Sequence, residues 1–95
     1  MCRIEIIANK SVQDDVIDVL EDNVTDILYT IIPVVYGRGK RDRKLGTGTW
    51  PETNFLLFSY VKKSQIPIIR GAIQALKQKF PNEGIKLFIT KKAML

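Results

Sequence analysis

The 95-residue sequence predicts a single α+β domain in which the elements follow the order strand, helix, strand, strand, helix, strand. Short segments rich in isoleucine, valine and aromatic residues predict the strands. Two other segments repeat their apolar residues at helical spacing. The two middle strand segments flank a long glycine-rich stretch, as expected of a hairpin with an extended tip.

The first half of the chain predicts a strand, a helix and a second strand. Residues 3–8 (RIEIIA) are short and rich in isoleucine, which is typical of a strand. Ser11 offers an N-cap for a helix over residues 12–22, where the apolar positions follow helical spacing: Val12, Val16, Val19 and Leu20. Residues 27–36 (ILYTIIPVVY) predict the second strand. Pro33 indicates an edge position or a bulge there, because proline cannot donate a ladder hydrogen bond.

The second half repeats this pattern. Residues 55–61 (FLLFSYV) and 85–90 (IKLFIT) predict two further strands. Between them, Ser64 can cap a helix over residues 65–79, and Pro67 fits its first turn. The apolar face of this helix is Ile66, Ile69, Ile73, Leu76 and Phe80. The resulting order is the ferredoxin-like βαββαβ arrangement, in which both helices cover one face of a four-stranded antiparallel sheet.

Residues 37–54 are unlike the rest of the chain. Hydrophobic periodicity stops there, four glycines free the backbone to adopt positive φ, and five cations crowd the first half: Arg38, Lys40, Arg41, Arg43 and Lys44. A loop this long in so small a domain is usually either functional or disordered. Trp50 is either an interface anchor or a side chain folded back onto the domain. We expect the loop to contact a partner; the alternative is a solvated, flexible segment.

Both faces of the predicted sheet are apolar. Alternate residues of a strand point to opposite faces, and both alternating sets are mainly hydrophobic in residues 27–36 and 55–61. A monomer would leave one of these faces in water, which soluble monomers rarely do. The few residues after the last strand cannot cover a whole sheet. The sequence therefore predicts that this face is buried against other copies of the chain.

The net charge of +5 is unevenly distributed. Residues 13–26 carry six acids and no bases, so the rest of the chain, with 15 bases and 4 acids, sums to +11. A basic surface favours phosphate, nucleic acid or an acidic protein as partner. Asp14, Asp18 and Asp22 share one helical row, which is either a weak site for a hard cation or, as we favour, an exposed acidic face.

The residue types also narrow the chemistry. The chain has no histidine and one cysteine, Cys2, which we expect to be a small apolar residue rather than a nucleophile. No disulfide framework and no metal site built from soft ligands are expected. No side chains form a recognisable catalytic set, so we expect a protein that is not an enzyme. The sequence shows neither a signal segment nor an 18-residue apolar run, which predicts a cytoplasmic protein.

Several of these features together resemble the PII signal-transduction superfamily. They are the element order, the opening RIEIIA strand, the turn at Gly37-Arg38-Gly39, the long loop, and NEGIKLFI at the last strand. The resemblance covers essentially the whole chain. It implies a homotrimer that packs its sheets inward, with nucleotide-binding positions between subunits at Gly37, Gly39, Gly84 and Lys86. Glycine amides approaching phosphates and a lysine neutralising them make physical sense.

The resemblance also implies how such a protein acts. An effector, ATP, ADP or AMP, would order or release the long loop, which is the T-loop of that family. The loop would then dock on a target enzyme or membrane transporter through residues 38–54, with six partner-binding residues: Arg38, Lys40, Arg41, Arg43, Lys44 and Trp50. No other cofactor is implied, and nucleic acid is a disfavoured partner.

The chain departs from the family pattern at four places. Family members often end with arginines that clamp phosphates, whereas this chain has only Lys91 and Lys92 there. Arg41 stands where the family usually has a glutamine that helps to bind magnesium, ATP and 2-oxoglutarate. Gly84 is displaced from the position of the family's second glycine-and-lysine loop. Residues 37–54 contain no tyrosine that could be modified.

Two other functions remain open at this stage. The RNA-recognition fold has the same element order and this chain is basic, but residues 55–61 lack the Arg/Lys-Gly-aromatic pattern and the free sheet face looks mainly aliphatic. A metal-handling trimer of the CutA kind shares the fold, although the absence of histidine counts against it.

Overall fold

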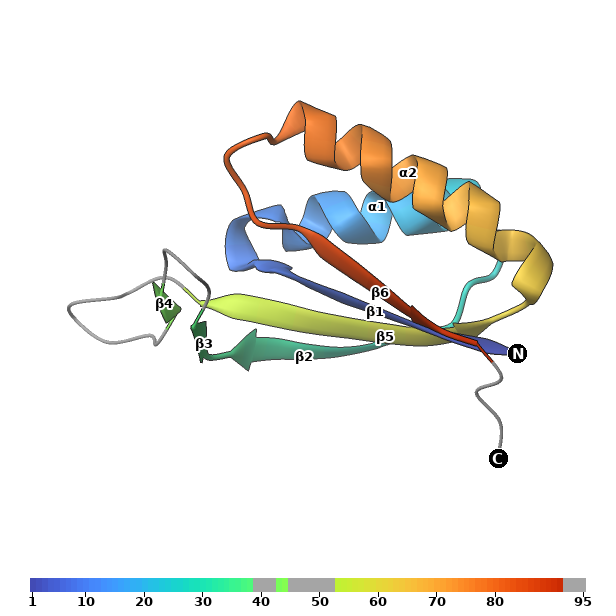
Figure 1. The fold of residues 1–95 in the computed structure, drawn as a ribbon, viewed down its shortest axis with the longest axis horizontal. Helices are drawn as coiled ribbons and strands as arrows, with labels where there is room; N and C mark the ends of the chain where they lie inside the picture. The colour runs from blue at the N-terminus through green and yellow to red at the C-terminus, as the bar shows by residue number, and fades with distance from the viewer. Residues whose placement is uncertain (39–42, 45–52, 92–95) are drawn as a thin grey trace.

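The computed structural model describes residues 1–38, 43–44 and 53–91. One antiparallel sheet of four strands forms its centre, in the order β2-β5-β1-β6 (Figure 1). The strands are β1 (Cys2–Asn9), β2 (Thr30–Val35), β5 (Asn54–Val61) and β6 (Lys86–Thr90). The predicted ferredoxin-like α+β fold is therefore confirmed.

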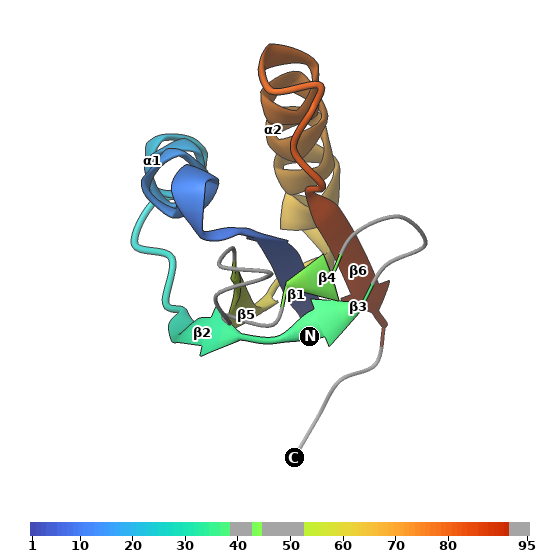
Figure 2. The same cartoon turned by 90° about the vertical axis from the view of Figure 1, so that its left-hand side faces the viewer.

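The two helices, α1 (Gln13–Asn23) and α2 (Ile66–Lys79), cover the same face of this sheet. Figure 2 shows α1 above the β2 side and α2 above the β6 side. Within the described part of the chain, no segment covers the opposite face, which we call the open face. No helix among the described residues is long and apolar enough to cross a membrane.

The core lies between the helices and the sheet. Alternate residues of the two central strands are buried, as their period of two requires. Cys2, predicted to be a small apolar residue, is one of them, with an exposed fraction of 3%. The full core set is Cys2, Ile4, Ile6 and Ala8 of β1; Phe55, Leu57 and Val61 of β5; Val16 and Leu20 of α1; Ile66, Ile69, Ile73 and Leu76 of α2; and Val12, Val24 and Ile85, which lie just outside these elements. Burial of this apolar surface is the main source of stability.

The helix starts differ from the predicted caps. A 3₁₀ turn over Lys10–Val12 precedes α1, and the Asn9 side chain, not Ser11, caps it by accepting from the Ser11 backbone N–H at 2.9 Å. A second 3₁₀ turn precedes α2, where the Gln65 side chain accepts from the Lys62 backbone N–H at 2.9 Å. Ser64 is therefore not the cap. Several polar side chains near the start of a helix can cap it, and the spacing of apolar residues in the sequence does not show which of them does so.

The second strand is shorter than predicted, since residues 27–29 lie outside it. Asp26 turns the chain after α1 with a φ of 54°, in the left-handed region. The hydroxyl of buried Ser59 then donates to the backbone carbonyl of Leu28. This carbonyl is therefore bonded to a side chain and not to a backbone N–H of a neighbouring strand. Further along, the β2–β5 register shifts between Ile32 and Val35, around Pro33. The proline therefore stands on an edge strand and at an irregularity, as predicted.

The predicted loop begins as a second, smaller sheet. Strand β3 (Gly37–Arg38) pairs antiparallel with β4 (Arg43–Lys44), with Gly37 opposite Lys44 and Arg38 opposite Arg43. These four positions were predicted as irregular loop, which is wrong. Each of these strands has only two residues, which is too few for an alternating hydrophobic pattern, so their pairing could not be predicted from periodicity.

Replacing Ser59 with alanine should lower the free energy of unfolding by about 1 kcal/mol, because the Leu28 carbonyl loses its buried partner. Chemical denaturation at matched protein concentration measures this value. Ser64 to alanine is the control, since Ser64 is exposed and should change stability by less than about 0.5 kcal/mol. Equal losses in both variants would contradict the anchoring role.

Candidate functional site

Three of the four predicted nucleotide-binding positions lie in the described part of the chain. Gly37 follows β2 directly, Gly84 lies in the turn after α2, and Lys86 begins β6. The fourth, Gly39, lies outside the described residues.

The predicted partner-binding residues divide in the same way. Arg38 is exposed at the end of β3. The backbone of Arg43 and Lys44 forms β4. Lys40, Arg41 and Trp50 lie outside the described residues, so their contacts stay predictions.

The strand register places Gly37 and Lys86 at the same end of the sheet. The last residue of β2 pairs with Asn54 at the start of β5, and Asn54 pairs with Asn9 at the end of β1. Lys86 pairs with Ile7, two positions from that end of β1. This is the end from which the β3–β4 ribbon projects (Figure 1).

Although they share one end, the strand that leads into Gly37 and the strand that begins at Lys86 lie on opposite edges of the sheet. Strands β2 and β6 are the outermost strands of the order β2-β5-β1-β6. Three strand spacings separate them, or about 14 Å at roughly 4.8 Å each. Gly37 itself lies two residues beyond the end of β2, in β3 of the separate two-stranded sheet, next to the Asn54 side chain of β5.

The backbone does not require glycine at Gly37 or Gly84. Neither residue has a φ in the left-handed region. A Cβ at position 37 would stand 3.6 Å from the Asn54 side-chain nitrogen, an ordinary contact, and a Cβ at position 84 would meet nothing within 4 Å. The explanation of Gly37 as a turn residue with positive φ is thus wrong, because the chain continues there as strand β3. A close approach of another molecule remains as a reason for both glycines.

Gly84 and Lys86 offer two free groups to an anion. The Gly84 N–H takes part in no hydrogen bond among the described residues, and Gly84 is exposed. Lys86 is also exposed, and the only ion pair within the described part of the chain joins Arg3 and Glu5. A backbone N–H and an ammonium group two residues apart suit a phosphate or carboxylate.

The open face combines aromatic, aliphatic and charged side chains. Its apolar members include Tyr60 and Phe88, which are 49% and 50% exposed. The expectation of a mainly aliphatic face is therefore wrong, because the register brings three aromatic rings onto it. The residues that the pairing places on this face include Arg3, Glu5, Ile7, Thr30, Ile32, Leu56, Phe58, Tyr60, Lys86, Phe88 and Thr90.

Arg3 organises the centre of the open face. Its Nε lies 2.8 Å from a Glu5 carboxylate oxygen, and its Nη1 donates to the Tyr60 hydroxyl at 2.7 Å. The guanidinium carbon stands 4.3 Å from the centre of the Phe58 ring and 5.5 Å from that of Tyr60. Hydrogen bonds to Glu5 and then Tyr60 raise the pKa of Arg3 above its usual value. The opposite charges of Arg3 and Glu5 therefore neutralise each other. The Arg3 guanidinium group also covers one face of the Phe58 ring.

This arrangement bears on what can cover the open face. Burying a charge is costly unless it is paired and hydrogen-bonded, and here both conditions are met within one chain. RNA-recognition modules stack bases on free aromatic rings, and Arg3 already occupies the Phe58 ring. Sequence reasoning missed this cluster, because Arg3 meets Tyr60 only through the β1–β5 register. The one available signal was the pair of charges two residues apart in a strand, which must share a face.

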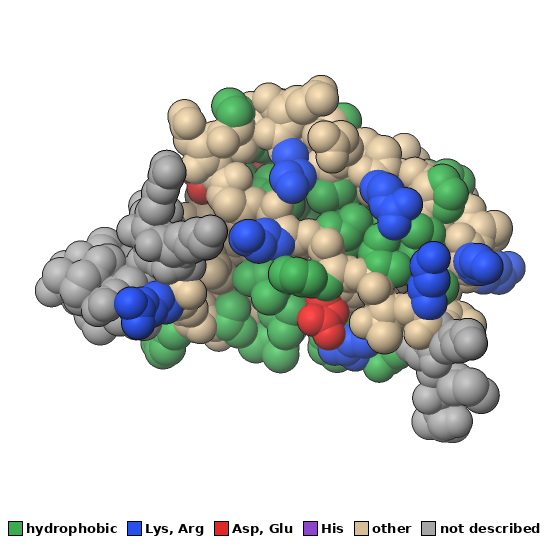
Figure 3. Space-filling model, viewed as in Figure 1, with side chains coloured by type: hydrophobic (Ala, Val, Ile, Leu, Met, Phe, Trp, Pro, Cys, Tyr) green, Lys and Arg blue, Asp and Glu red, His purple; other side chains and the backbone are tan. Residues whose placement is uncertain are grey.

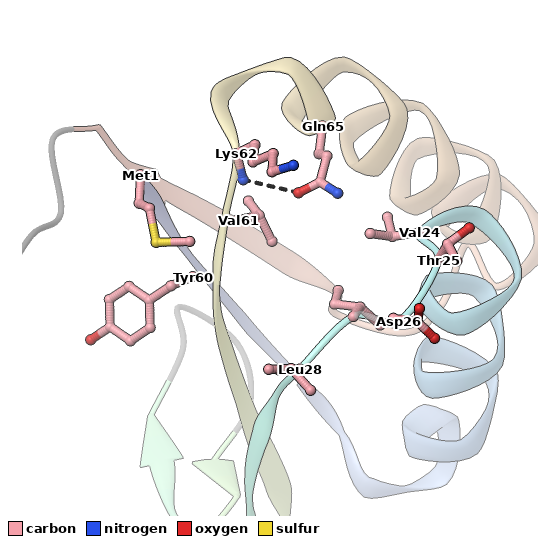
Figure 4. Close-up of a pocket in the computed structure, with 10 residues that line it drawn as sticks. Met1, Val24, Thr25, Asp26, Leu28, Tyr60, Val61, Lys62 and Gln65 are labelled. Atoms are coloured by element: carbon pink, nitrogen blue, oxygen red, sulfur yellow. Dashed lines mark hydrogen bonds between the residues drawn. The ribbon is translucent and has the colours of Figure 1, made fainter.

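A shallow pocket lies at the other end of the sheet. It has a volume of about 150 Å³ and lies between the α1–β2 turn and the end of β5. Figure 4 shows Met1 and Tyr60 on one side of it and Thr25 and Asp26 on the other, with Lys62 bonded to Gln65 above. This pocket is mainly apolar and lies away from the predicted nucleotide-binding positions.

The described residues contain no group of three or more His, Cys, Asp or Glu side chains that could hold a metal ion. In particular, Asp14, Asp18 and Asp22 all lie exposed on α1.

The acidic face of α1 does make one contact toward the β2 edge. Tyr29, in the segment that leads into β2, donates to a Glu21 carboxylate oxygen at 3.4 Å. Partial burial raises the pKa of Tyr29, and the negative charges of Glu21 and Asp18 raise it further. Glu21 and Asp18 therefore lie on the flank of α1 that faces the β2 edge.

Comparison with known proteins supports the fold. No protein-family model matches the chain, and no curated protein sequence matches it. Solved structures do match. CPII, a nitrogen regulatory PII-like protein from Thiomonas intermedia K12 bound to ADP, AMP and bicarbonate, shares 16% identity with a TM-score of 0.74, over 93% of this chain and 81% of that chain.

Two further structures match with lower scores. A candidate PII-like signalling protein from Thermus thermophilus shares 18% identity with a TM-score of 0.61, over 93% of this chain and 82% of that one. The de novo designed protein Foldit4 shares 10% identity with a TM-score of 0.58, over 97% and 98%. The PII-like fold predicted from the resemblance is thus confirmed. A designed protein shares it, so function must be argued from the site.

The raised pKa of Tyr29 predicts a pH dependence. The Tyr29 contribution to stability should be constant below pH 10, the usual pKa of tyrosine, and should fall as pH rises above it, because only the unfolded chain then ionises. Glu21 to glutamine should lower the pH at which Tyr29 ionises. Ultraviolet absorbance of tyrosinate measures this ionisation. The Tyr29 to phenylalanine variant shows which part of the absorbance change comes from Tyr29. Asp14 to asparagine is the control, and an equal shift in that variant would contradict the assignment.

Proposed function

We propose that this protein is a PII-like regulator that is not an enzyme and that binds an adenine nucleotide between copies of itself. One observation carries the proposal: the end of β2 that leads into Gly37 and the Gly84–Lys86 segment share one end of the sheet, of which β2 and β6 are the opposite edges. In our proposal a site that uses both forms where the β2 edge of one copy meets the β6 edge of another.

The chemistry of these positions supports a phosphorylated ligand. The Gly84 N–H, which donates to no described residue, and the Lys86 ammonium group, which forms no ion pair with one, suit phosphate oxygens. Glycine at 37 and 84 leaves the backbone accessible, although neither backbone conformation requires glycine. The Thiomonas protein of the same fold was solved with ADP and AMP. ADP and AMP are therefore the first ligands to test, with ATP beside them.

The open face supports the assembly. It holds large hydrophobic side chains that stay exposed in one copy, among them Ile32, Tyr60 and Phe88. Its central charges are paired within the chain, so burial leaves neither Arg3 nor Glu5 unmatched. A homotrimer with the open faces turned inward would bury this surface and bring the β2 and β6 edges of neighbouring copies together.

The β3–β4 ribbon links the proposed site to the proposed partner-binding segment. Gly37 belongs to β3, and the chain continues from β3 into the cationic residues 38–54. A nucleotide that contacts Gly37 would favour one arrangement of this segment over others by its differential contacts. In our proposal the segment then docks, in the cytoplasm, on a target enzyme or a membrane transporter with an acidic surface.

Isothermal titration calorimetry with ADP, AMP and ATP tests the ligand. We expect at least one of them to bind, and Lys86 to glutamine to weaken that binding about tenfold, because one charge-assisted contact is lost. Lys62 to glutamine is the matched control, since Lys62 is also exposed but lies at the opposite end of the sheet. The absence of heat with all three nucleotides would refute the nucleotide-binding proposal.

Gly84 to alanine tests whether the ligand approaches the backbone. The added methyl group meets no protein atom within 4 Å, so the variant should fold normally and yet bind the nucleotide more weakly. Gly71 to alanine is the matched control. Gly71 is exposed within α2 with equal open space, and alanine there should stabilise the helix by about 0.5–1 kcal/mol without changing nucleotide affinity. Unchanged affinity in the Gly84 variant would remove Gly84 from the site.

A further inference from the structure

The last turn of α2 carries two exposed lysines, Lys77 and Lys79, on opposite sides of its buried stripe. A helix turns by about 100° per residue, so a residue four positions after another lies about 40° further round, and one three positions after it lies about 60° back. Lys77 is four residues after buried Ile73, and Lys79 is three residues after buried Leu76. The two lysines therefore border the stripe on its two sides.

The handedness of the helix shows which lysine lies toward β6. Figure 1 shows that α2 runs toward the end of the sheet from which the β3–β4 ribbon projects, so it runs toward the viewer in Figure 2. There its buried stripe faces down onto the sheet, with α1 on the left and β6 on the right. A right-handed helix that approaches the viewer turns anticlockwise, which places Lys77 on the right, above β6. Lys79 lies on the other flank, where its ammonium nitrogen stands 5.5 Å from the centre of the Phe80 ring.

The turn after α2 brings a third lysine, Lys86, back to the same end of the sheet. Backbone hydrogen bonds of 3.0, 3.1 and 3.1 Å close this turn within residues 76–85. Its two ends, Leu76 and Ile85, are both buried in the one core cluster. The residue that follows each of them is an exposed lysine, Lys77 after the first and Lys86 after the second. The turn therefore folds back on itself with a lysine at either end.

Lys77 and Lys86 stand on the two sides of the edge strand β6. Lys86 begins this strand and belongs to the open face, whereas Lys77 lies on the helix side. Exposed Gly84, whose N–H donates to no described residue, lies in the turn between them. Neither lysine forms an ion pair within the described part of the chain. Figure 3 shows Lys and Arg side chains distributed over α2 and β6 on this side of the molecule.

We propose that Lys77 is a further phosphate-binding residue and that, together with Lys86, it selects a nucleoside diphosphate over a nucleoside monophosphate. This inference rests on the proposed function, because it states which phosphorylated ligand the same site prefers. An anion at this edge meets a cation from each side of β6 and a backbone N–H between them. A second phosphate group extends the ligand beyond the reach of one lysine and gives the other its partner.

The end of α2 makes a second cation necessary for a highly charged ligand. The free carbonyl groups of the last turn of a helix carry partial negative charge, which opposes an anion placed beside them. One lysine offsets this opposition and the charge of a single phosphate group only in part. Lys77 supplies a further positive charge from the same last turn. Lysine suits this task because its ammonium group is a point charge on a flexible stem.

Calorimetry with ADP and with AMP tests the inference on the native chain and on two single variants. We expect the native chain to bind ADP at least about tenfold more tightly than AMP, because one more charge-assisted contact forms. Lys77→Gln should weaken ADP binding about tenfold and AMP binding by less than about twofold.

Lys79→Gln is the matched control, since it removes the same charge from the same helical turn on the other flank. It should leave both affinities within about twofold of the native values. Both variants should lower the midpoint of thermal unfolding by the same amount, because both lysines interact with the end of the helix. A purely structural role of Lys77 would therefore affect stability and leave the ratio of ADP to AMP affinity unchanged.

Three results would overturn the inference. They are an unchanged ADP-to-AMP affinity ratio in Lys77→Gln, an equal fall of that ratio in Lys79→Gln, and a native chain that binds AMP as tightly as ADP. All three leave nucleotide binding itself intact, so the proposed function would stand. A native chain that binds neither nucleotide would instead refute the nucleotide-binding proposal and this inference with it.

Discussion

The structure depends on the fact that two helices can cover only one face of a four-stranded sheet. On the covered face, β1 and β5 bury every second residue against α1 and α2, and this burial supplies most of the stability. The same alternation projects Ile32, Phe58, Tyr60 and Phe88 to the other side. A domain of this size has no further layer among its described residues, so these hydrophobic side chains stay exposed in one copy.

The Arg3 cluster makes the open face compatible with burial. An unpaired guanidinium in the middle of an apolar face would oppose assembly through its desolvation cost. Arg3 is instead paired with Glu5, hydrogen-bonded to Tyr60 and packed over Phe58, so its polar groups have partners before any second copy arrives. The charges at the centre of the open face are thus paired within the chain, and the Phe58 ring, already covered by Arg3, is less available for stacking a nucleic-acid base.

Strand order bears directly on the proposed ligand site. The order β2-β5-β1-β6 places β2, which leads into Gly37, and β6, which begins at Lys86, on opposite edges of the sheet. In our proposal the β2 edge of one copy meets the β6 edge of another. Ligand binding and assembly would in that case be linked, because a nucleotide that bridges two copies stabilises their association by mass action.

Several features of this protein were determined by local sequence. Hydrophobic periodicity located both helices and four strands, Pro33 indicated an edge strand with an irregular register, and the alternation in residues 55–61 predicted an apolar second face. The tertiary structure decided what depends on pairing between distant residues. Examples are the Arg3–Tyr60 contact, the hydrogen bond from Ser59 to the Leu28 carbonyl, and the placement of β2 and β6 on opposite edges of the sheet. Spacing along the chain specifies which face a side chain takes, whereas register and strand order specify its neighbours, and these follow from the packing of the whole domain.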